Sequence, residues 1–155
     1  MPLRSVFHPD RIRLGLQAAS KDEVLADMAE LLCLGSSLDG AAVRRALWER
    51  EHIASTAVGS GIAIPHGRLL EVNEVLGALG IYPEGVPFEA ADDTPVRIVV
   101  ALLAPEDRPA EHLKTLARVS RRLRMFEARE RLLGADSPRE AFDALVGLES
   151  METAR

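Results

Sequence analysis

The sequence predicts an α/β fold in which helices sandwich a mixed central β-sheet. Two apolar segments, 73–82 and 96–104, have the length and composition of buried strands. Helical patterns precede and follow them, and helices alone occupy the last part of the chain. This order of elements favours one sheet covered by helices.

The composition is that of an ordinary globular chain of 155 residues, with 47% hydrophobic and 28% charged residues. That length suits a single domain, 1–155. The net charge of −5 argues against broad nucleic-acid binding, and the one cysteine excludes an intrachain disulfide. The sequence shows no signal segment and no apolar run that could span a membrane. We therefore expect a cytoplasmic protein without membrane insertion.

The first part of the chain contains signals for an edge strand and two helices. Residues 11–14 alternate between polar and apolar, which is typical of a short edge strand. A capping box at 20–23 begins a helix that Gly35 ends. Asp39 caps a second helix at about 40–52.

The two main strands differ in their expected surroundings. The segment 73–82 contains glycines and alanine among its apolar residues, and we expect it to end at Pro83-Glu84-Gly85. The segment 96–104 is almost continuously apolar, which predicts a central strand that is covered on both faces.

Helices complete the chain from about residue 109, with Pro109 in the first turn of the first one. The apolar stripe that we expect on its inner side consists of Leu113, Leu116, Ala117, Ser120 and Leu123. Its run of cations indicates either a solvated face or a docking surface and consists of Lys114, Arg118, Arg121, Arg122 and Arg124. A short helix follows at 125–133, and a capping box at 137–140 begins a terminal helix.

Most candidate catalytic residues of the sequence lie in the stretch 50–68. A short apolar run leads to His66, which follows Pro65 and precedes Gly67. We expect this histidine at a sheet edge, with the chain free to turn away at Gly67. Neutral imidazole is a nucleophile near physiological pH. Taken alone, the same residue could be a histidine in a surface turn.

Three residues upstream of His66 could bind the oxygens of a phosphoryl group. Arg50 offers a cation, and Ser55 and Thr56 offer hydroxyl donors. Arg50 also has a structural interpretation, because a cation near the C-terminus of a helix is favoured by the helix dipole. The four histidines of the chain lack metal-ligand spacing, so no metal site is predicted.

This stretch resembles the signature of the type-2 IIA domains of the phosphotransferase system (PTS), the fructose/mannitol/nitrogen-regulatory family. The family pattern runs Arg-Glu, a small residue with Ser-Thr, then Gly-x-Gly-(Ile/Val)-Ala-Ile-Pro-His-(Gly/Cys)-Arg. The corresponding residues here are Arg50-Glu51, Ala54-Ser55-Thr56 and Gly59-Ser60-Gly61-Ile62-Ala63-Ile64-Pro65-His66-Gly67-Arg68. The resemblance extends over about residues 5–148, which we expect to form the core of the domain.

The resemblance implies a phosphoryl relay without a metal or other cofactor. A phosphohistidine carrier protein, HPr or its nitrogen-branch counterpart NPr, would donate to Nε2 of His66, and a backbone acceptor would hold the other ring nitrogen. In the family, a second histidine in a His-Leu-x-x-Leu helix lies beside the first one, and here it corresponds to His112. Without the resemblance, His112 could be an exposed helical histidine. The implied stabilising groups are His112, Arg50, Ser55 and Thr56.

Two function classes follow from the resemblance, and a third remains as an alternative. A regulatory protein of the nitrogen type would control target proteins through its phosphorylation state. A sugar-transport subunit would pass the phosphoryl group from His66 to a IIB domain. A binding module that is no longer phosphorylated is the third possibility, against which the presence of His66, His112 and Arg50 argues. The closeness of the signature to the nitrogen type favours the regulatory class.

Overall fold

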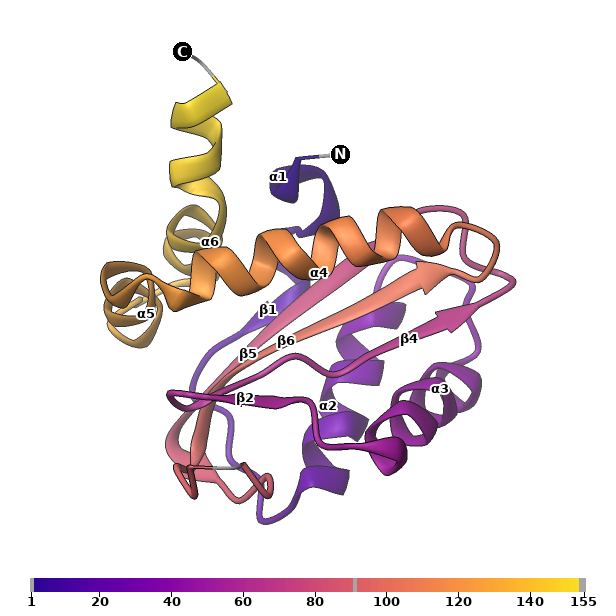
Figure 1. Cartoon of the computed structure of the whole chain (residues 1–155), viewed down its shortest axis with the longest axis horizontal. Coiled ribbons are helices and arrows are strands. Elements are labelled where there is room, and N and C mark those ends of the chain that lie inside the picture. The colour runs from indigo at the N-terminus through magenta and orange to yellow at the C-terminus, as the bar shows by residue number, and fades with distance from the viewer. Residues whose placement is uncertain (1, 91, 154–155) are drawn as a thin grey trace.

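The computed structural model describes residues 2–90 and 92–153, with side chains up to residue 147. These residues form one six-stranded sheet of mixed direction, as the sequence predicts (Figure 1). The strand order is β1-β5-β6-β3-β2, and β4 pairs with β6 beyond the end of β3. The strands are β1 (Ile12–Arg13), β2 (Ala57–Gly59), β3 (Ile62–Ala63), β4 (His66–Leu69), β5 (Leu76–Val86) and β6 (Val96–Pro105).

The strand β6 is the centre of the sheet. It runs antiparallel to β5 on one side and parallel to β3 and β4 on the other. Every residue of β6 except Arg97 is buried, which confirms the prediction of a central strand covered on both faces. Among the strands of the described residues, the short β1 pairs only with β5, so the predicted edge strand is confirmed as well.

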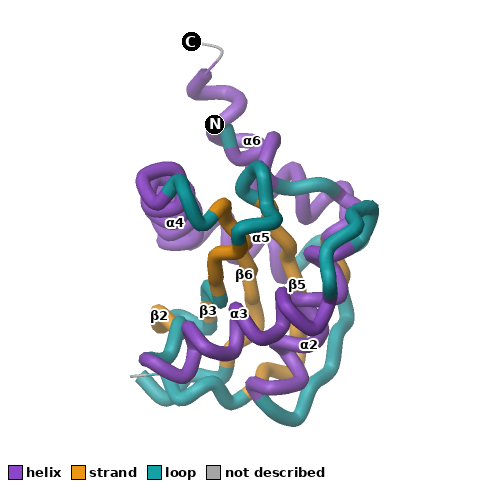
Figure 2. Tube along the Cα trace, turned by 90° about the vertical axis from the view of Figure 1, so that its right-hand side faces the viewer, coloured by secondary structure: helices purple, strands orange, loops and turns teal. Residues whose placement is uncertain are grey.

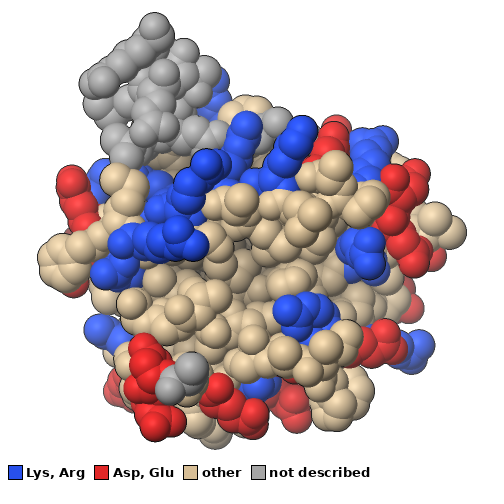
Figure 3. Space-filling view, in the orientation of Figure 1, with Lys and Arg blue, Asp and Glu red and all other residues tan. Residues whose placement is uncertain are grey.

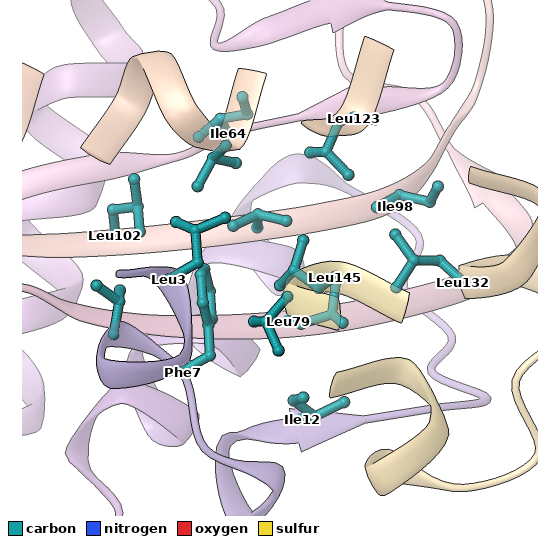
Figure 4. Packing of buried hydrophobic residues seen from close by; sticks show 14 of the residues in the cluster. Leu3, Phe7, Ile12, Ile64, Leu79, Ile98, Leu102, Leu123, Leu132 and Leu145 are labelled. Atoms are coloured by element: carbon teal, nitrogen blue, oxygen red, sulfur yellow. The ribbon is translucent and has the colours of Figure 1, made fainter. Parts of the chain in front are cut away.

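Helices cover both faces of the sheet (Figure 2). One buried cluster joins the sheet to α2 and α3, and the other joins it to α1, α4, α5 and α6. Figure 4 shows the second cluster, in which Phe7, Leu79, Leu102 and Leu145 belong to the core on one face of the sheet. In the described part of the chain, no helix combines the length and apolarity that crossing a membrane requires. The helices are α1 (Leu3–Val6), α2 (Lys21–Cys33), α3 (Gly40–Ile53), α4 (Pro109–Arg124), α5 (Phe126–Leu133) and α6 (Pro138–Thr153), with a 3₁₀ turn at Pro9–Arg11.

The predicted helix starts are confirmed by their hydrogen bonds. The Ser20 hydroxyl accepts from the backbone N–H of Glu23 at 3.3 Å, and Ser137 accepts from Glu140 at 3.1 Å. Asp39 caps α3 by accepting from the N–H of Ala41 at 3.1 Å. Each of these bonds satisfies a donor that the first helical turn leaves without a partner.

The inner side of α4 differs from the predicted apolar stripe. Leu113 is 66% exposed and Ala117 also faces solvent, whereas the side chains that face the sheet and α6 are His112, Thr115, Val119, Arg122 and Leu123. The predicted stripe is confirmed at Leu123, which is buried, and at Leu116, which packs partly buried against the core, and is wrong at Leu113 and Ala117. The signal was incomplete because three of the five inward residues are polar. Arg122 was also wrongly assigned to the basic face, since its guanidinium is buried and donates to the backbone carbonyl of Leu145 at 3.1 Å.

The strand β5 both begins and ends later than predicted, since it starts at Leu76 and not at residue 73. It continues through Pro83-Glu84-Gly85 to Val86, so the predicted end is wrong. These residues form an irregularity in the pairing with β6, between the pairs Ile81–Ile98 and Val86–Val96. Gly85 adopts a φ of 83°, which a glycine accommodates without strain. The turn residues therefore bend the strand and do not end it.

Candidate active site

His66 is the first residue of β4, which in the described part of the chain pairs only with β6 and lies at an edge of the sheet. Its Nδ1 lies 2.8 Å from the backbone carbonyl oxygen of Ile64. A carbonyl oxygen only accepts hydrogen bonds, so Nδ1 carries the ring proton and Nε2 keeps its lone pair. The intervening residue, Pro65, fixes its own φ and accepts a hydrogen bond from the N–H of Leu102 at 2.9 Å. The local sequence therefore selects the tautomer that leaves Nε2 as the nucleophile.

Gly67 has a different role from the predicted one. The chain does not turn away after His66, because β4 continues to Leu69. A Cβ on Gly67 would lie 3.0 Å from the backbone carbon of Ala46 in α3, so the glycine permits α3 to pack directly against β4. Arg50 lies one helical turn after Ala46, and this packing brings it to the same groove as His66.

His112, in the first turns of α4, lies next to His66. The two ring centroids are 5.3 Å apart and the rings are tilted by 53°. His112 is buried, and its Nδ1 has no hydrogen-bond partner among the described residues. The sequence-based alternative of an exposed helical histidine is therefore wrong.

Both histidines are held in the neutral state. Burial lowers the pKa of His66, with the nearby Arg50 acting in the same direction, while the bond to Ile64 and the Glu51 carboxylate oppose it. Burial lowers the pKa of His112 to about 4, with further contributions from His66 and Arg68. A neutral His66 is the form that can attack phosphorus, and a neutral His112 still carries one N–H donor.

An open groove of about 620 Å³ surrounds the two histidines, with walls formed by α3, β4 and α4. Three arginines line it: Arg45, Arg50 and Arg68. Arg50 donates one hydrogen bond to the carbonyl of Ala54 at 2.9 Å, which uses one of the five N–H donors of its guanidinium. Guanidinium groups bind phosphoryl oxygens well because their planar array of donors matches the oxygen geometry.

Arg68 is a site candidate that the sequence analysis did not single out. It lies two residues after His66 in β4, lines the groove and contributes to the low pKa of His112. The signal for it was present, because alternate residues of a strand lie on the same face. The turn that we expected at Gly67 concealed this relation.

Ser55 and Thr56 are not among the residues that line the groove. The Ser55 hydroxyl donates to the carbonyl of Phe88 at 2.8 Å, and the Thr56 hydroxyl donates to the carboxylate of Glu51 at 2.5 Å. Both hydroxyl protons are therefore engaged within the protein. The sequence could not indicate the acceptor of Ser55, because Phe88 lies 33 residues away.

Glu51 is the buried carboxylate of a hydrogen-bond series that ends at His66. Its buried carboxylate accepts the N–H of Thr56 at 3.0 Å and forms an ion pair with Nζ of Lys21 at 3.2 Å. The carbonyl of Thr56 in turn accepts the N–H of Ile64 at 3.0 Å. A continuous series of hydrogen bonds thus joins Lys21 and Glu51, through Thr56 and Ile64, to Nδ1 of His66.

An α/β sandwich that presents a neutral histidine and several arginines in one open groove is the architecture of a histidine phosphocarrier domain. The chain belongs to the family described as phosphoenolpyruvate-dependent sugar phosphotransferase system, EIIA 2, whose model matches residues 5–146. The family to which the sequence pattern pointed is thereby confirmed.

Relatives of two kinds match nearly the whole chain. The nitrogen regulatory protein of Bradyrhizobium diazoefficiens is 34% identical over 146 residues, which cover 94% of this chain and 95% of that protein. The PTS system fructose-specific EIIABC component of Bacillus subtilis is 32% identical over 149 residues, which cover 96% of this chain and 23% of that protein.

Solved structures confirm the predicted fold. The nitrogen regulatory protein IIA-Ntr from Neisseria meningitidis superposes with a TM-score of 0.87 at 34% identity, covering 92% of this chain and 98% of that one. The complex of enzyme IIAMtl and phosphorylated enzyme IIBMtl from Escherichia coli gives a TM-score of 0.76 at 29% identity, covering 91% and 99%.

Proposed function

We propose that this chain accepts a phosphoryl group on Nε2 of His66 from a phosphohistidine carrier protein of the HPr or NPr type. The observation that carries the proposal is the hydrogen bond from Nδ1 to the Ile64 carbonyl at 2.8 Å, because it leaves Nε2 unprotonated. The half-buried ring faces a groove that a partner protein can approach. We further propose that the whole chain is a single domain that acts in the cytoplasm.

The proposed transfer balances without a cofactor. The lone pair on Nε2 of His66 attacks phosphorus while the phosphorus–nitrogen bond of the donor histidine breaks, and the bonding electrons leave with the donor ring. The proton of His66 stays on Nδ1 throughout, hydrogen-bonded to the Ile64 carbonyl oxygen. Such a transfer joins two chemically similar states, so the protein chiefly positions the groups and stabilises charge.

We assign the charge-stabilising role to Arg50, Arg68 and His112. All three line the groove beside His66, and each can donate hydrogen bonds to the oxygens of the phosphoryl group in transit. A phosphate-binding role for Ser55 and Thr56 stays a prediction. It requires their hydroxyls to leave their present acceptors, Phe88 and Glu51.

The regulatory, nitrogen-type role is the one we favour for the phosphorylated protein. A relative of that name matches 94% of this chain and is itself covered over 95% of its length. The alternative is a sugar-transport subunit that passes the phosphoryl group to a IIB domain. It is supported by the match to a fructose-specific EIIABC component and by the likeness to the IIA chain of a IIA–IIB complex.

Labelling tests the proposal. The purified chain is incubated with enzyme I, the carrier protein and phosphoenolpyruvate labelled in the phosphoryl group, next to the His66→Ala variant. We expect acid-labile label on the wild type and none on the variant. If the wild type stays unlabelled while a control IIA protein is labelled by the same donors, the proposed function is contradicted. The third function class, a binding module that is not phosphorylated, would then be the remaining interpretation.

A second step separates transport from regulation. The labelled chain is mixed with purified IIB domains of the fructose and mannitol classes. Retention of the label on His66 is expected for the regulatory role, whereas rapid transfer to a IIB domain supports the transport alternative.

A further inference from the structure

The outward side of α4 carries a stripe of cations, the α4 stripe, which we define as Lys114, Arg121 and Arg124. All three side chains are exposed and lie on the side opposite the buried residues of the helix. At 1.5 Å per residue, the stripe is about 15 Å long. The sequence between Glu111 and Glu127 contains no acidic residue, although the whole chain has a net charge of −5. The positive charge is therefore concentrated locally, and Figure 3 shows Lys and Arg side chains gathered along α4.

The α4 stripe lies on the same helix that forms one wall of the groove holding His66. Leu113 precedes Lys114, is 66% exposed and lines the groove. Ile53 of α3 is 81% exposed and also lines the groove. Two exposed apolar side chains thus belong to the entrance of the groove, one from α3 and one from α4. A partner large enough to cover both the groove and the outward side of α4 would contact these apolar side chains and the stripe together.

We propose that the α4 stripe selects a phosphohistidine carrier protein whose surface beside its own histidine is acidic. This inference rests on the proposed function, because it concerns the partner that delivers phosphate to His66. Ile53 and Leu113 contact apolar residues around the carrier's histidine, and the carrier's carboxylates lie along Lys114, Arg121 and Arg124. A carrier with a basic surface at that place is rejected, because like charges oppose one another across the same contact.

The observations favour a protein over an anionic membrane as the occupant. The stripe lies on the helix that forms one wall of the groove, and the phosphoryl group has to be delivered to a half-buried ring within that groove. A protein that presents a phosphohistidine fills the groove and reaches the stripe in one contact. A flat lipid surface has no group that enters the groove.

Charges at the rim of an interface act mainly on the rate of encounter and on its dependence on salt. We therefore expect the triple variant K114Q/R121Q/R124Q to accept phosphate from an acidic carrier about tenfold more slowly at low ionic strength. The difference should shrink at about 0.5 M salt, where the Debye length falls below about 5 Å. The matched control R13Q/R44Q/R139Q removes the same charge from exposed positions on other elements and should behave like the wild type.

The experiment measures the rate of His66 labelling from two donors. The first is the phosphorylated nitrogen-branch carrier protein, and the second is phosphoramidate, a small donor that needs no docking surface. We expect the triple variant to be slowed with the carrier alone and to match the wild type with phosphoramidate, which also shows that its site is folded. Equal rates of the triple variant and the control with the carrier at low salt would overturn the proposal.

Two other outcomes have distinct meanings. If neither donor labels wild-type His66, the proposed function itself fails, and the docking inference fails with it. If the triple variant loses sedimentation with phosphatidylserine vesicles while its rate with the carrier is unchanged, the stripe is a membrane-binding surface and the docking proposal is overturned.

Discussion

The backbone carbonyl of Ile64 lies 2.8 Å from Nδ1 of His66, and this contact determines which ring nitrogen can react. It is a local contact, because only Pro65 separates the two residues. Its direction nevertheless depends on more distant residues, since the N–H of Ile64 is held by the carbonyl of Thr56 at 3.0 Å. Thr56 in turn is held by Glu51. The nucleophile is therefore oriented before any donor arrives, which reduces the cost of reaching the transition state.

Glu51→Gln tests this orientation. We expect the free energy of unfolding to fall by about 1–3 kcal/mol, because Lys21 loses its charged partner and the Thr56 bonds weaken. Although burial dominates the lowered pKa of His66, the Glu51 carboxylate opposes that shift, so the variant should have a still lower His66 pKa. Nitrogen-15 NMR of the imidazole measures the pKa and the tautomer together. If both are unchanged in the folded variant, Glu51 has no positioning role.

Gly67→Ala tests the close packing of α3 on β4. The added methyl group meets the backbone of Ala46 at about the 3.0 Å seen for an ideal Cβ, so α3 must shift and carry Arg50 with it. We expect a loss of about 1–3 kcal/mol in unfolding free energy from the overpacking, together with slower labelling of His66. Urea unfolding and the labelling rate measure the two effects.

The matched control for this change is Gly147→Ala in α6, where a Cβ meets nothing within 4 Å. Alanine is favoured over glycine in a helix by about 0.5–1 kcal/mol, so this variant should be slightly more stable and transfer phosphate normally. A Gly67→Ala protein that is as stable and active as the control would contradict the packing account.

Acid should destabilise the protein partly through His112. Burial and the neighbouring His66 and Arg68 lower its pKa to about 4, while the unfolded chain binds the proton near pH 6.5. Between these values the unfolded state binds more protons, so stability falls as pH decreases from about 6.5 to 4. The contribution of this one group is up to about 3 kcal/mol. Urea unfolding at several pH values should show a smaller loss for His112→Gln, and equal losses would refute the assignment.

Arg68→Gln should affect both histidines. The Arg68 charge disfavours protonation of His112, although burial and His66 contribute more to the low pKa, so its removal should raise the pKa of His112 above about 4. It also removes a donor to the phosphoryl oxygens, and we expect labelling to slow by about tenfold to a hundredfold. Histidine titration by NMR and the labelling rate check the two outcomes. An unchanged labelling rate would show that Arg50 and His112 stabilise the phosphoryl oxygens without Arg68.

The sequence predicted the elements whose signals are local. The almost continuous apolar run at 96–104 favoured a strand covered on both faces, and this segment is β6. The capping residues Ser20, Asp39 and Ser137 marked helix starts to within a residue, because a cap interacts with the next two or three residues. His66 could be identified for the same reason, since its whole motif is contiguous.

The orientation of α4 could not be obtained in this way. An apolar stripe predicts the inner face only if apolar residues lie inside, and here Leu113 faces outward at the groove while His112 and Arg122 face inward. His112 belongs to the site, and Arg122 binds backbone carbonyls of α6. The inward orientation of these two polar residues depends on partners that are distant in sequence, so no local sequence pattern predicts it. The hydroxyl acceptors of Ser55 and Thr56 escaped prediction because loop side chains can bind several alternative partners.

Nitrogen-15 NMR of the phosphorylated protein tests the central claim most directly. The chain, labelled at its histidine rings, is phosphorylated by the carrier, and phosphorus–nitrogen couplings identify the bonded nitrogen. We predict one phosphohistidine, at His66, with phosphorus on Nε2 and a proton retained on Nδ1. Phosphorus on Nδ1 of His66, or on any of the other three histidines, would contradict the account.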